Sequence, residues 1–235
     1  DEEHTDAQPP RRQGRQGGMA GFMEFRRKLG EFMQKEGVVA TLRVSEKSHD
    51  LQNMTGSWAS QSKVPVLFIT QEHMALIYRL MKRNLPVEIE VNAGGRFTKG
   101  PVTVYNTVGE IPGTEKANEI VLLGAHLDSW DLGTGAHDDG AGVAIMTAAA
   151  HLIGSLEQHP RRTVRVVLFA NEEFGLSGAR GYARAHAGEA ARIVCGMESD
   201  LGAFEPFGLK SRVTPEFRPA VAQMHSVLAP LGIEY

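Results

Sequence analysis

The sequence predicts an α/β protein whose mostly parallel or mixed sheet is covered by helices on both faces. Three short apolar segments have the length and composition of buried strands: residues 119–125, 163–170 and 193–197. A helix rich in alanine is expected at residues 142–156, and a second one near residues 178–187, with Ser177 placed to cap its N-terminus. Strands that alternate with helices in this way favour a parallel sheet between two helix layers.

A different pattern precedes these segments. Residues 1–18 are polar and rich in Gly, Pro, Gln and Arg, which indicates a flexible stretch. The spacing of apolar residues then predicts helices at 19–35 and 71–83, and strands at 38–44, 64–69 and 85–91. The predicted domains are therefore a flexible segment at 1–18, a small α/β unit at 19–100 and a larger α/β domain at 101–235.

The composition excludes several function classes. The net charge is −3, from 25 Lys and Arg against 28 Asp and Glu, so the chain lacks the basic footprint of a nucleic-acid-binding protein. No apolar run reaches the roughly 18 residues that a membrane-spanning helix needs, so no membrane span is expected. The single cysteine, Cys195, excludes an internal disulfide and a cysteine-rich zinc finger.

The three predicted strands of the larger domain all end in side chains that can bind metals. The residues that follow them are, in chain order, His126 and Asp128, then Glu172 and Glu173, then Glu198 and Asp200. Asp138 stands just before the next helix, at the same end of the sheet. Because the carboxyl ends of parallel strands share one edge, these groups converge there. So many carboxylates repel one another unless a cation holds them together, and the pattern therefore indicates a metal site.

The ligand types narrow down the metal and its chemistry. One histidine with several carboxylates suits zinc, cobalt or manganese better than a thiolate site or a calcium loop. The neighbouring Glu172 and Glu173 cannot easily bind one ion in an equivalent way. One of the two is therefore expected to bind metal, and the other to act as a general base on metal-bound water.

Together, the motifs at these strand ends resemble those of metallopeptidase family 28, and most closely its carboxypeptidase Q branch. The segments that carry the resemblance are residues 124–131 (GAHLDSWD), 138–142 (DDGAG), 171–175 (NEEFG) and 197–202 (MESDLG). The resemblance covers residues 104–235, and it extends more weakly back to residue 36, where the family carries an inserted protease-associated-like domain. It implies the zinc-exopeptidase fold for the larger domain.

The resemblance also implies which residues bind metal. His126 and Asp200 would bind one zinc ion, Glu173 would bind a second, and Asp138 would bridge the two. It further implies a cis peptide bond between Asp138 and Asp139. The implied cofactor is thus Zn²⁺, with two ions in each complete active site.

For catalysis, the resemblance implies that Glu172 is the general acid and base, and that Asp128 hydrogen-bonds to the imidazole of His126 and fixes its orientation. The family completes its second zinc site with a histidine further along the chain than Tyr235. We therefore expect that the chain is cut at its C-terminus and that this piece by itself lacks full activity. Its N-terminus, which has neither an initiator methionine nor a signal peptide, is expected to be cut as well.

The expected function is that of a zinc-dependent exopeptidase that hydrolyses dipeptides or short peptides with a free terminus, using a metal-bridging water activated by Glu172. Two alternatives stay open: a single-zinc acyltransferase of the glutaminyl-cyclase type, and a non-catalytic receptor-like relative. Small peptides are the expected partners, and a homodimer stays open as the assembly. A secreted, periplasmic or extracellular location is expected.

Overall fold

The computed structural model describes residues 18–53, 64–94, 96, 99–200 and 202–233. The chain divides into two compact units, residues 1–98 and 99–235, each with its own sheet. The flexible segment predicted for residues 1–18 lies outside the described residues except for Gly18, which begins a helix. No helix in the described part of the chain combines the length and the apolar character that crossing a membrane requires.

Within its described residues, the first unit contains two helices and a two-stranded parallel sheet. Its elements are, in chain order, α1 (Gly18–Lys35), β1 (Thr41–Val44), β2 (Val66–Ile69) and α2 (Gln71–Lys82). Thr70 caps α2, because its hydroxyl oxygen accepts a hydrogen bond from the amide of His73. The strand predicted at residues 85–91 is wrong. Most apolar side chains there are exposed, and no neighbouring strand among the described residues pairs with this backbone.

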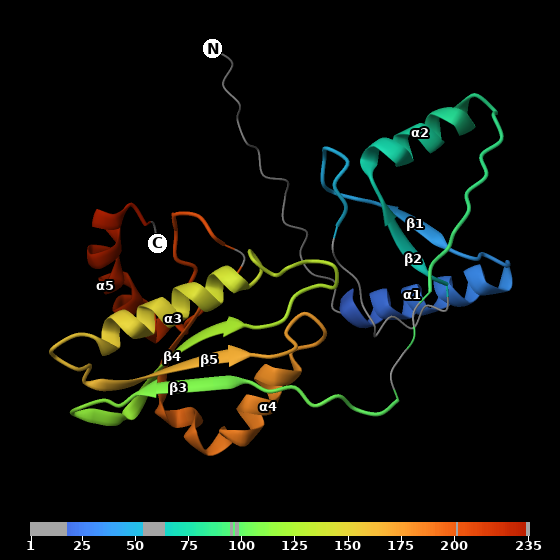
Figure 1. Cartoon of the computed structure of the whole chain (residues 1–235). Helices are drawn as coiled ribbons and strands as arrows, with labels where there is room; N and C mark the ends of the chain where they lie inside the picture. The colour runs from blue at the N-terminus through green and yellow to red at the C-terminus, as the bar shows by residue number, and fades with distance from the viewer. Residues whose placement is uncertain (1–17, 54–63, 95, 97–98, 201, 234–235) are drawn as a thin grey trace, which may run out of the picture. The chain divides into compact units, whose positions relative to one another are not determined.

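A four-stranded mixed sheet organises the second unit (Figure 1). Its elements are, in chain order, β3 (Thr107–Ile111), β4 (Lys116–His126), α3 (Gly140–Gly154), β5 (Arg162–Phe169), α4 (Ser177–Ala185), the 3-10 helix η1 (Ala187–Arg192), β6 (Ile193–Glu198), η2 (Pro215–Phe217), α5 (Arg218–Leu228) and η3 (Ala229–Leu231). The strand order is β3-β5-β4-β6. Strand β4 lies parallel to β5 and β6, whereas β3 runs antiparallel to β5. The predicted α/β class with a mixed sheet is thereby confirmed.

The path of the chain explains why helices cover both faces of this sheet. From β4 the chain passes through α3 to β5, and from β5 it returns through α4 to β6, on the far side of β4. Crossovers between parallel strands are right-handed, so two crossovers in opposite directions place their helices on opposite faces. Figure 1 shows α3 on one face and α4 on the other. The loop after β4 thus leads to one face of the sheet and the loop after β5 to the other. α/β sheets usually bind ligands in the crevice between two such loops.

The core of the second unit lies between α3 and the central strands. Its buried side chains are Leu123, Ala125, Met146, Val164 and Leu168. Burial of apolar surface contributes about 25 cal/mol per Å², so this layer fixes α3 on β4 and β5. Because α3 packs in this way, the residues at its N-terminus are held over the carboxyl ends of both strands.

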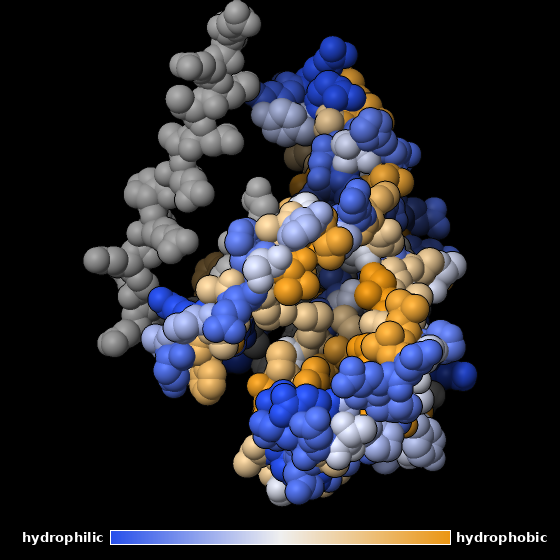
Figure 2. All heavy atoms as spheres, turned by 90° about the vertical axis from the view of Figure 1, so that its left-hand side faces the viewer, coloured by the Kyte–Doolittle hydropathy of each residue, from blue (hydrophilic) through white to orange (hydrophobic). Residues whose placement is uncertain are grey.

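Two details of this unit differ from the sequence prediction. Strand β3 was not predicted, because Gly109 interrupts its apolar pattern and most of its residues are exposed. Ser177 does not cap α4. The cap position is taken by Leu176 in a left-handed conformation, and the Ser177 hydroxyl instead accepts a hydrogen bond from Asn171. Further apolar side chains lie open at the surface, as the orange residues of Figure 2 show.

Candidate active site

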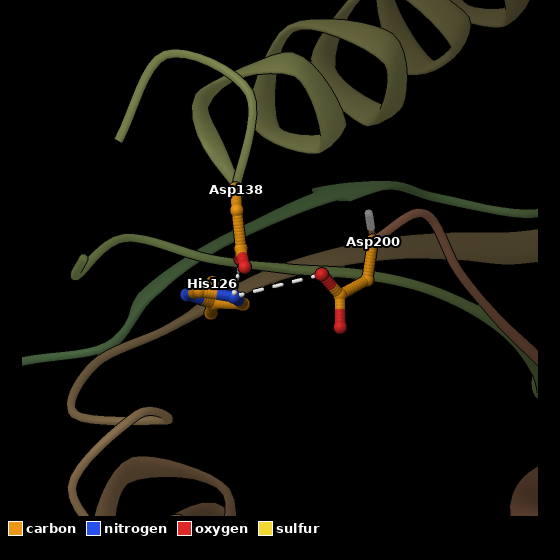
Figure 3. Close-up of side chains that lie close together, drawn as sticks. All are labelled: His126, Asp138 and Asp200. Atoms are coloured by element: carbon orange, nitrogen blue, oxygen red, sulfur yellow. Dashed lines mark hydrogen bonds and ion pairs between the residues drawn. The ribbon is translucent and has the colours of Figure 1, made fainter. Parts of the chain in front are cut away.

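His126, the last residue of β4, lies at the centre of a cluster of carboxylates. Its side chain is almost fully buried, and its Nε2 lies 3.0 Å from Asp138 Oδ1 and 3.8 Å from Asp200 Oδ1 (Figure 3). Three elements supply these residues: the end of β4, the turn before α3 and the segment after β6. One ligand atom of each residue belongs to a group in which all atoms lie within 4.8 Å of one another.

The hydrogen bonds of His126 determine which of its ring nitrogens is available to bind a metal ion. Its Nδ1 lies 2.9 Å from the backbone carbonyl oxygen of Asp128. Since a carbonyl oxygen can only accept, Nδ1 carries the proton and donates it. Asp138 Oδ1, 3.0 Å from Nε2, likewise only accepts, so Nε2 donates to it while the ring is protonated. In the neutral ring, Nε2 is unprotonated and its lone pair is available. This is the form in which an imidazole binds a metal ion.

Asp128 differs in detail from the role that the resemblance implies. Its carbonyl oxygen, and not its carboxylate, bonds to His126, whose Nδ1 is 3.7 Å from Asp128 Oδ1. The carboxylate instead accepts hydrogen bonds from the backbone amides of Glu172, at 2.8 Å, and Glu173, at 3.1 Å. Asp128 therefore ties the loop after β5 to the loop after β4.

The side chain of Asp139 holds the backbone on which the cluster is built. The peptide bond between Asp138 and Asp139 is cis, as the resemblance implied. The buried carboxylate of Asp139 accepts from the amide of His126 at 2.9 Å and from the amide of Gly142 at 3.1 Å, and so caps α3. A Cβ at Gly142 would lie 2.1 Å from both Asp139 Oδ1 and the carbonyl oxygen of Ser199, so only glycine fits. This role was not predicted, although an acidic residue directly before a glycine-rich helix start indicates a cap.

Glu172 and Glu173 lie in the loop between β5 and α4. The carbonyl of Glu172 accepts from the amides of Gly175 and Leu176, which folds the loop into a tight turn. The side-chain Oε1 of Glu173 is buried and has no hydrogen-bond partner among the described residues. A buried polar atom left in this state costs about 1–3 kcal/mol, and more when it is charged.

Burial and neighbouring charges shift the ionisation of the site. Burial raises the pKa of Glu172 and of Glu173, and neighbouring carboxylates raise both further. For His126, burial lowers the pKa, but the carboxylates of Asp139 and Asp200 outweigh it, so the pKa is raised overall. All three groups are thus shifted toward binding a proton, as expected where anions crowd together.

These residues fit a zinc ion. Imidazole nitrogen and carboxylate oxygen are zinc ligands, and a cation would relieve both the crowding of negative charge and the unpartnered Oε1 of Glu173. No Lys or Arg in the described part of the chain forms an ion pair with Asp138, Asp200 or Glu173. Of the four predicted ligands, the structure brings His126, Asp138 and Asp200 into one group, whereas Glu173 stands outside it.

A pocket of about 440 Å³ adjoins the site. Its walls come from the segment before β3, from the loop after β4 and from the loop after β5, and they include Tyr105, Leu127 and Phe174. Trp130 contacts Phe174 edge-to-face, with ring centroids 4.9 Å apart, and so braces the same two loops against each other. The surface beside the carboxylates is thus partly apolar.

Comparison with known proteins relates this chain to a described family. The sequence profile of peptidase family M28 matches residues 106–231, which include every predicted site residue. Carboxypeptidase Q of Xenopus laevis is 37% identical over 171 residues, which cover 73% of this chain and 36% of that protein. The chain thus spans little more than about a third of the length of the curated relatives it matches.

Two solved structures resemble the fold. A peptidase M28 precursor from Shewanella amazonensis SB2B gives a TM-score of 0.70 at 36% identity, over 85% of this chain and 46% of that one. BSAP, a zinc aminopeptidase from Bacillus subtilis, gives a TM-score of 0.55 at 17% identity, over 87% of this chain and 54% of that one. At this lower identity, the second structure supports the fold alone.

Proposed function

Since the chain belongs to peptidase family M28, we propose that it carries the metal-binding and catalytic part of a zinc exopeptidase that hydrolyses dipeptides or short peptides with a free terminus. The observation that carries the proposal is the buried cluster of His126, Asp138 and Asp200, beside which Asp128 holds the loop of Glu172 and Glu173. A lone-pair nitrogen, several carboxylates and a glutamate with a raised pKa are the groups that metal-assisted hydrolysis needs.

The ligand roles are proposed as follows. His126 and Asp200 would hold one zinc ion, Glu173 would hold a second, and Asp138 would be a ligand of both. The lone pair of His126 Nε2 and the buried, unpartnered Oε1 of Glu173 support this division. When bound, zinc supplies Lewis acidity that polarises a carbonyl group and lowers the pKa of water.

Glu172 is the proposed general base. The bond from its amide to Asp128 anchors its backbone at the same edge of the sheet as His126. Burial raises its pKa, which moves a carboxylate toward the range in which a base works well near neutral pH. In peptide hydrolysis Glu172 takes a proton from the attacking water and passes it to the leaving nitrogen. The C–N bond then breaks to give a free carboxylate and a free amine.

Substrate blocking tests the exopeptidase assignment. The full-length protein should hydrolyse unblocked dipeptides and leave acetylated, amidated peptides of the same sequence intact. Peptides blocked at one end alone then decide whether a free amino or a free carboxyl group is required. Metal analysis after dialysis should find about two zinc ions per chain. Cleavage of doubly blocked peptides, or the absence of tightly bound zinc, would contradict the proposal.

Two substitutions separate the roles of the paired glutamates. Glu172→Gln should lower kcat by a factor of about 10²–10⁴ while zinc content stays near that of the wild type, because a base is lost and not a ligand. Glu173→Ala should lose zinc. Glu157→Gln, at an exposed glutamate after α3, is the matched control for handling and folding. An exchange of the two behaviours would reverse the assignment within the pair.

The domain organisation and location extend the proposal. Residues 19–100 are proposed to form part of a protease-associated-like inserted domain, and residues 101–235 part of the catalytic domain. The division of the chain near residue 98 supports this boundary. An exported protein is proposed, since the Shewanella amazonensis relative is described as a precursor. Fractionation of the producing cells tests this, and a signal confined to the cytosol would contradict it.

A further inference from the structure

The base of the loop that carries Glu172 and Glu173 is held by a residue that no motif singles out. Asn106 stands directly before the edge strand β3. Its Oδ1 accepts a hydrogen bond from the amide of Ala170 at 3.0 Å, and its Nδ2 donates one to the carbonyl of Gly178 at 2.9 Å. Ala170 directly follows β5, and Gly178 lies in the first turn of α4. One side-chain amide thus bridges the two ends of the loop.

The backbone at these two ends is packed around this amide. The amide of Gly178 donates to the carbonyl of Ala170 at 3.0 Å, which closes the loop between them. A Cβ at Gly178 would lie 2.1 Å from the Ala170 carbonyl oxygen and 2.5 Å from Asn106 Oδ1. No residue larger than glycine fits there without moving the loop. The position of the loop base therefore depends on the contact between Asn106 and these two backbone segments.

The backbone of the remaining loop residues is also restricted. Asn171 and Leu176 both have left-handed backbone angles, with φ of 57° and 60°, which few non-glycine residues adopt. Between them, the amides of Glu172 and Glu173 bond to the carboxylate of Asp128. The loop is thus held near its middle by Asp128 and at its base by Asn106, so a shift of the base displaces both glutamates.

We infer that Asn106 is a positioning residue, which sets the place of the general base and of one metal ligand by holding the loop that carries them. The inference rests on the proposed function, since it requires Glu172 and Glu173 to have these roles. Asn106 acts through the loop, because its two side-chain hydrogen bonds both go to the loop's backbone. Misplacing a catalytic group by about 1 Å can cost about 10²-fold in rate.

The test compares three variants of the full-length enzyme. Asn106→Ala removes both hydrogen bonds, whereas Asn106→Asp keeps the acceptor for Ala170 and loses the donor for Gly178. Thr163→Val is the matched control. The hydroxyl of Thr163 likewise bonds two backbone groups, the amide of Gly113 and the carbonyl of Ala117. Thr163 stands near the opposite end of β5, about 20 Å along the strand from the loop.

Asn106→Ala should lower kcat by about 10- to 100-fold, with KM changed much less, because transition-state geometry is lost rather than substrate binding. Asn106→Asp should lower kcat at least as far, because its second carboxylate oxygen would face the Gly178 carbonyl oxygen, and Thr163→Val should keep its kcat while losing comparable stability. Equal kcat values for Asn106→Ala and Thr163→Val would overturn the inference, as would a rise in KM alone.

Hydrogen exchange separates this inference from the proposed function. The amides of Glu172 and Glu173 should exchange faster in Asn106→Ala than in Thr163→Val, whether or not the enzyme cleaves peptides. A wild-type enzyme without peptidase activity would contradict the proposed function. The exchange rates would still test whether Asn106 positions the loop. Equal exchange in both variants would refute it.

Discussion

Replacing Asp139 with alanine should destabilise the fold strongly, although Asp139 is not a proposed ligand. Its buried carboxylate accepts hydrogen bonds from the amides of His126 and Gly142, both of which are buried. Alanine leaves both donors without an acceptor in a region where water does not reach. Each unsatisfied buried group costs about 1–3 kcal/mol, so Asp139→Ala should lower the free energy of unfolding by about 2–6 kcal/mol.

Asp139→Asn provides an internal comparison. Its amide oxygen can still accept from one of the two donors, whereas its NH2 group faces the other. That NH2 group and the amide that it faces are then both without an acceptor, so the expected loss is about as large as for alanine, about 2–6 kcal/mol. Asp131→Ala is the exposed control after the same strand, and its effect should stay within about 0.5 kcal/mol.

Urea unfolding of the metal-free, full-length protein, followed by circular dichroism, measures these differences without a contribution from bound zinc. The slope of the transition should stay constant, so that a shift of the midpoint reports stability. The reasoning would be refuted if Asp139→Ala stayed within about 1 kcal/mol of the wild type at unchanged slope, because the two amides would then have found other acceptors.

Three further outcomes are expected. Arg165→Ala should cost about 2–3 kcal/mol in urea unfolding, because the buried guanidinium pairs with two partly exposed glutamates and donates to the Tyr182 hydroxyl; a loss near zero would contradict this. The bond from Arg165 lowers the pKa of Glu189, so this pair stabilises the fold above about pH 4.3 and loses that contribution as pH falls further. Glu189→Gln should thus flatten the acid limb of the stability curve, and an unchanged limb would count against it. Gly178→Ala should lower both Tm and kcat, since its Cβ would overlap the Ala170 carbonyl oxygen, and wild-type values would show that the loop yields.

The sequence predicts the strands of the second unit and their terminal residues because both signals are local. An apolar run of about seven residues between turn-forming segments reads as a buried strand, and β4, β5 and β6 coincide with such runs. The burial expected for β6 is wrong, because it ends the strand order of the described sheet and most of its residues are exposed. His126 and Asp200 then follow from the rule that parallel strands share a carboxyl edge. The family resemblance adds the cis bond before Asp139, which no local rule indicates.

The residues that hold the site in place cannot be predicted from local sequence patterns. Asn106 bonds to backbone groups 64 and 72 positions away, and these separations carry no sequence pattern. The carboxylate of Asp128 bonds 44 and 45 positions away, so only the fold reveals what it holds. Residues 85–91 show the converse error. Their alternation has the form of a strand, but a strand also needs a neighbour to pair with, and this depends on the fold.

Asp128 and Glu173 differ in their hydrogen-bond partners, so replacing each by its neutral amide should change the stability of the metal-free protein in opposite directions. Asp128 accepts backbone amides, so Asp128→Asn should lower Tm with or without zinc. Glu173 has an unpartnered buried oxygen, and burial together with nearby carboxylates raises its pKa. Its charge therefore opposes folding near neutral pH, and Glu173→Gln should raise the Tm of the metal-free protein by about 2–4 °C if about 1 kcal/mol is relieved.

With zinc the order should reverse, because a ligand that binds only the folded state stabilises it in proportion to its affinity, and Glu173→Gln weakens that affinity. Thermal unfolding of both proteins with chelator and with excess zinc gives the four values that are needed. A merely structural role for Glu173 would make the variant less stable than the wild type in both conditions. Only a ligand whose charge is unfavourable without metal produces the crossing, so parallel losses would remove Glu173 from the metal site.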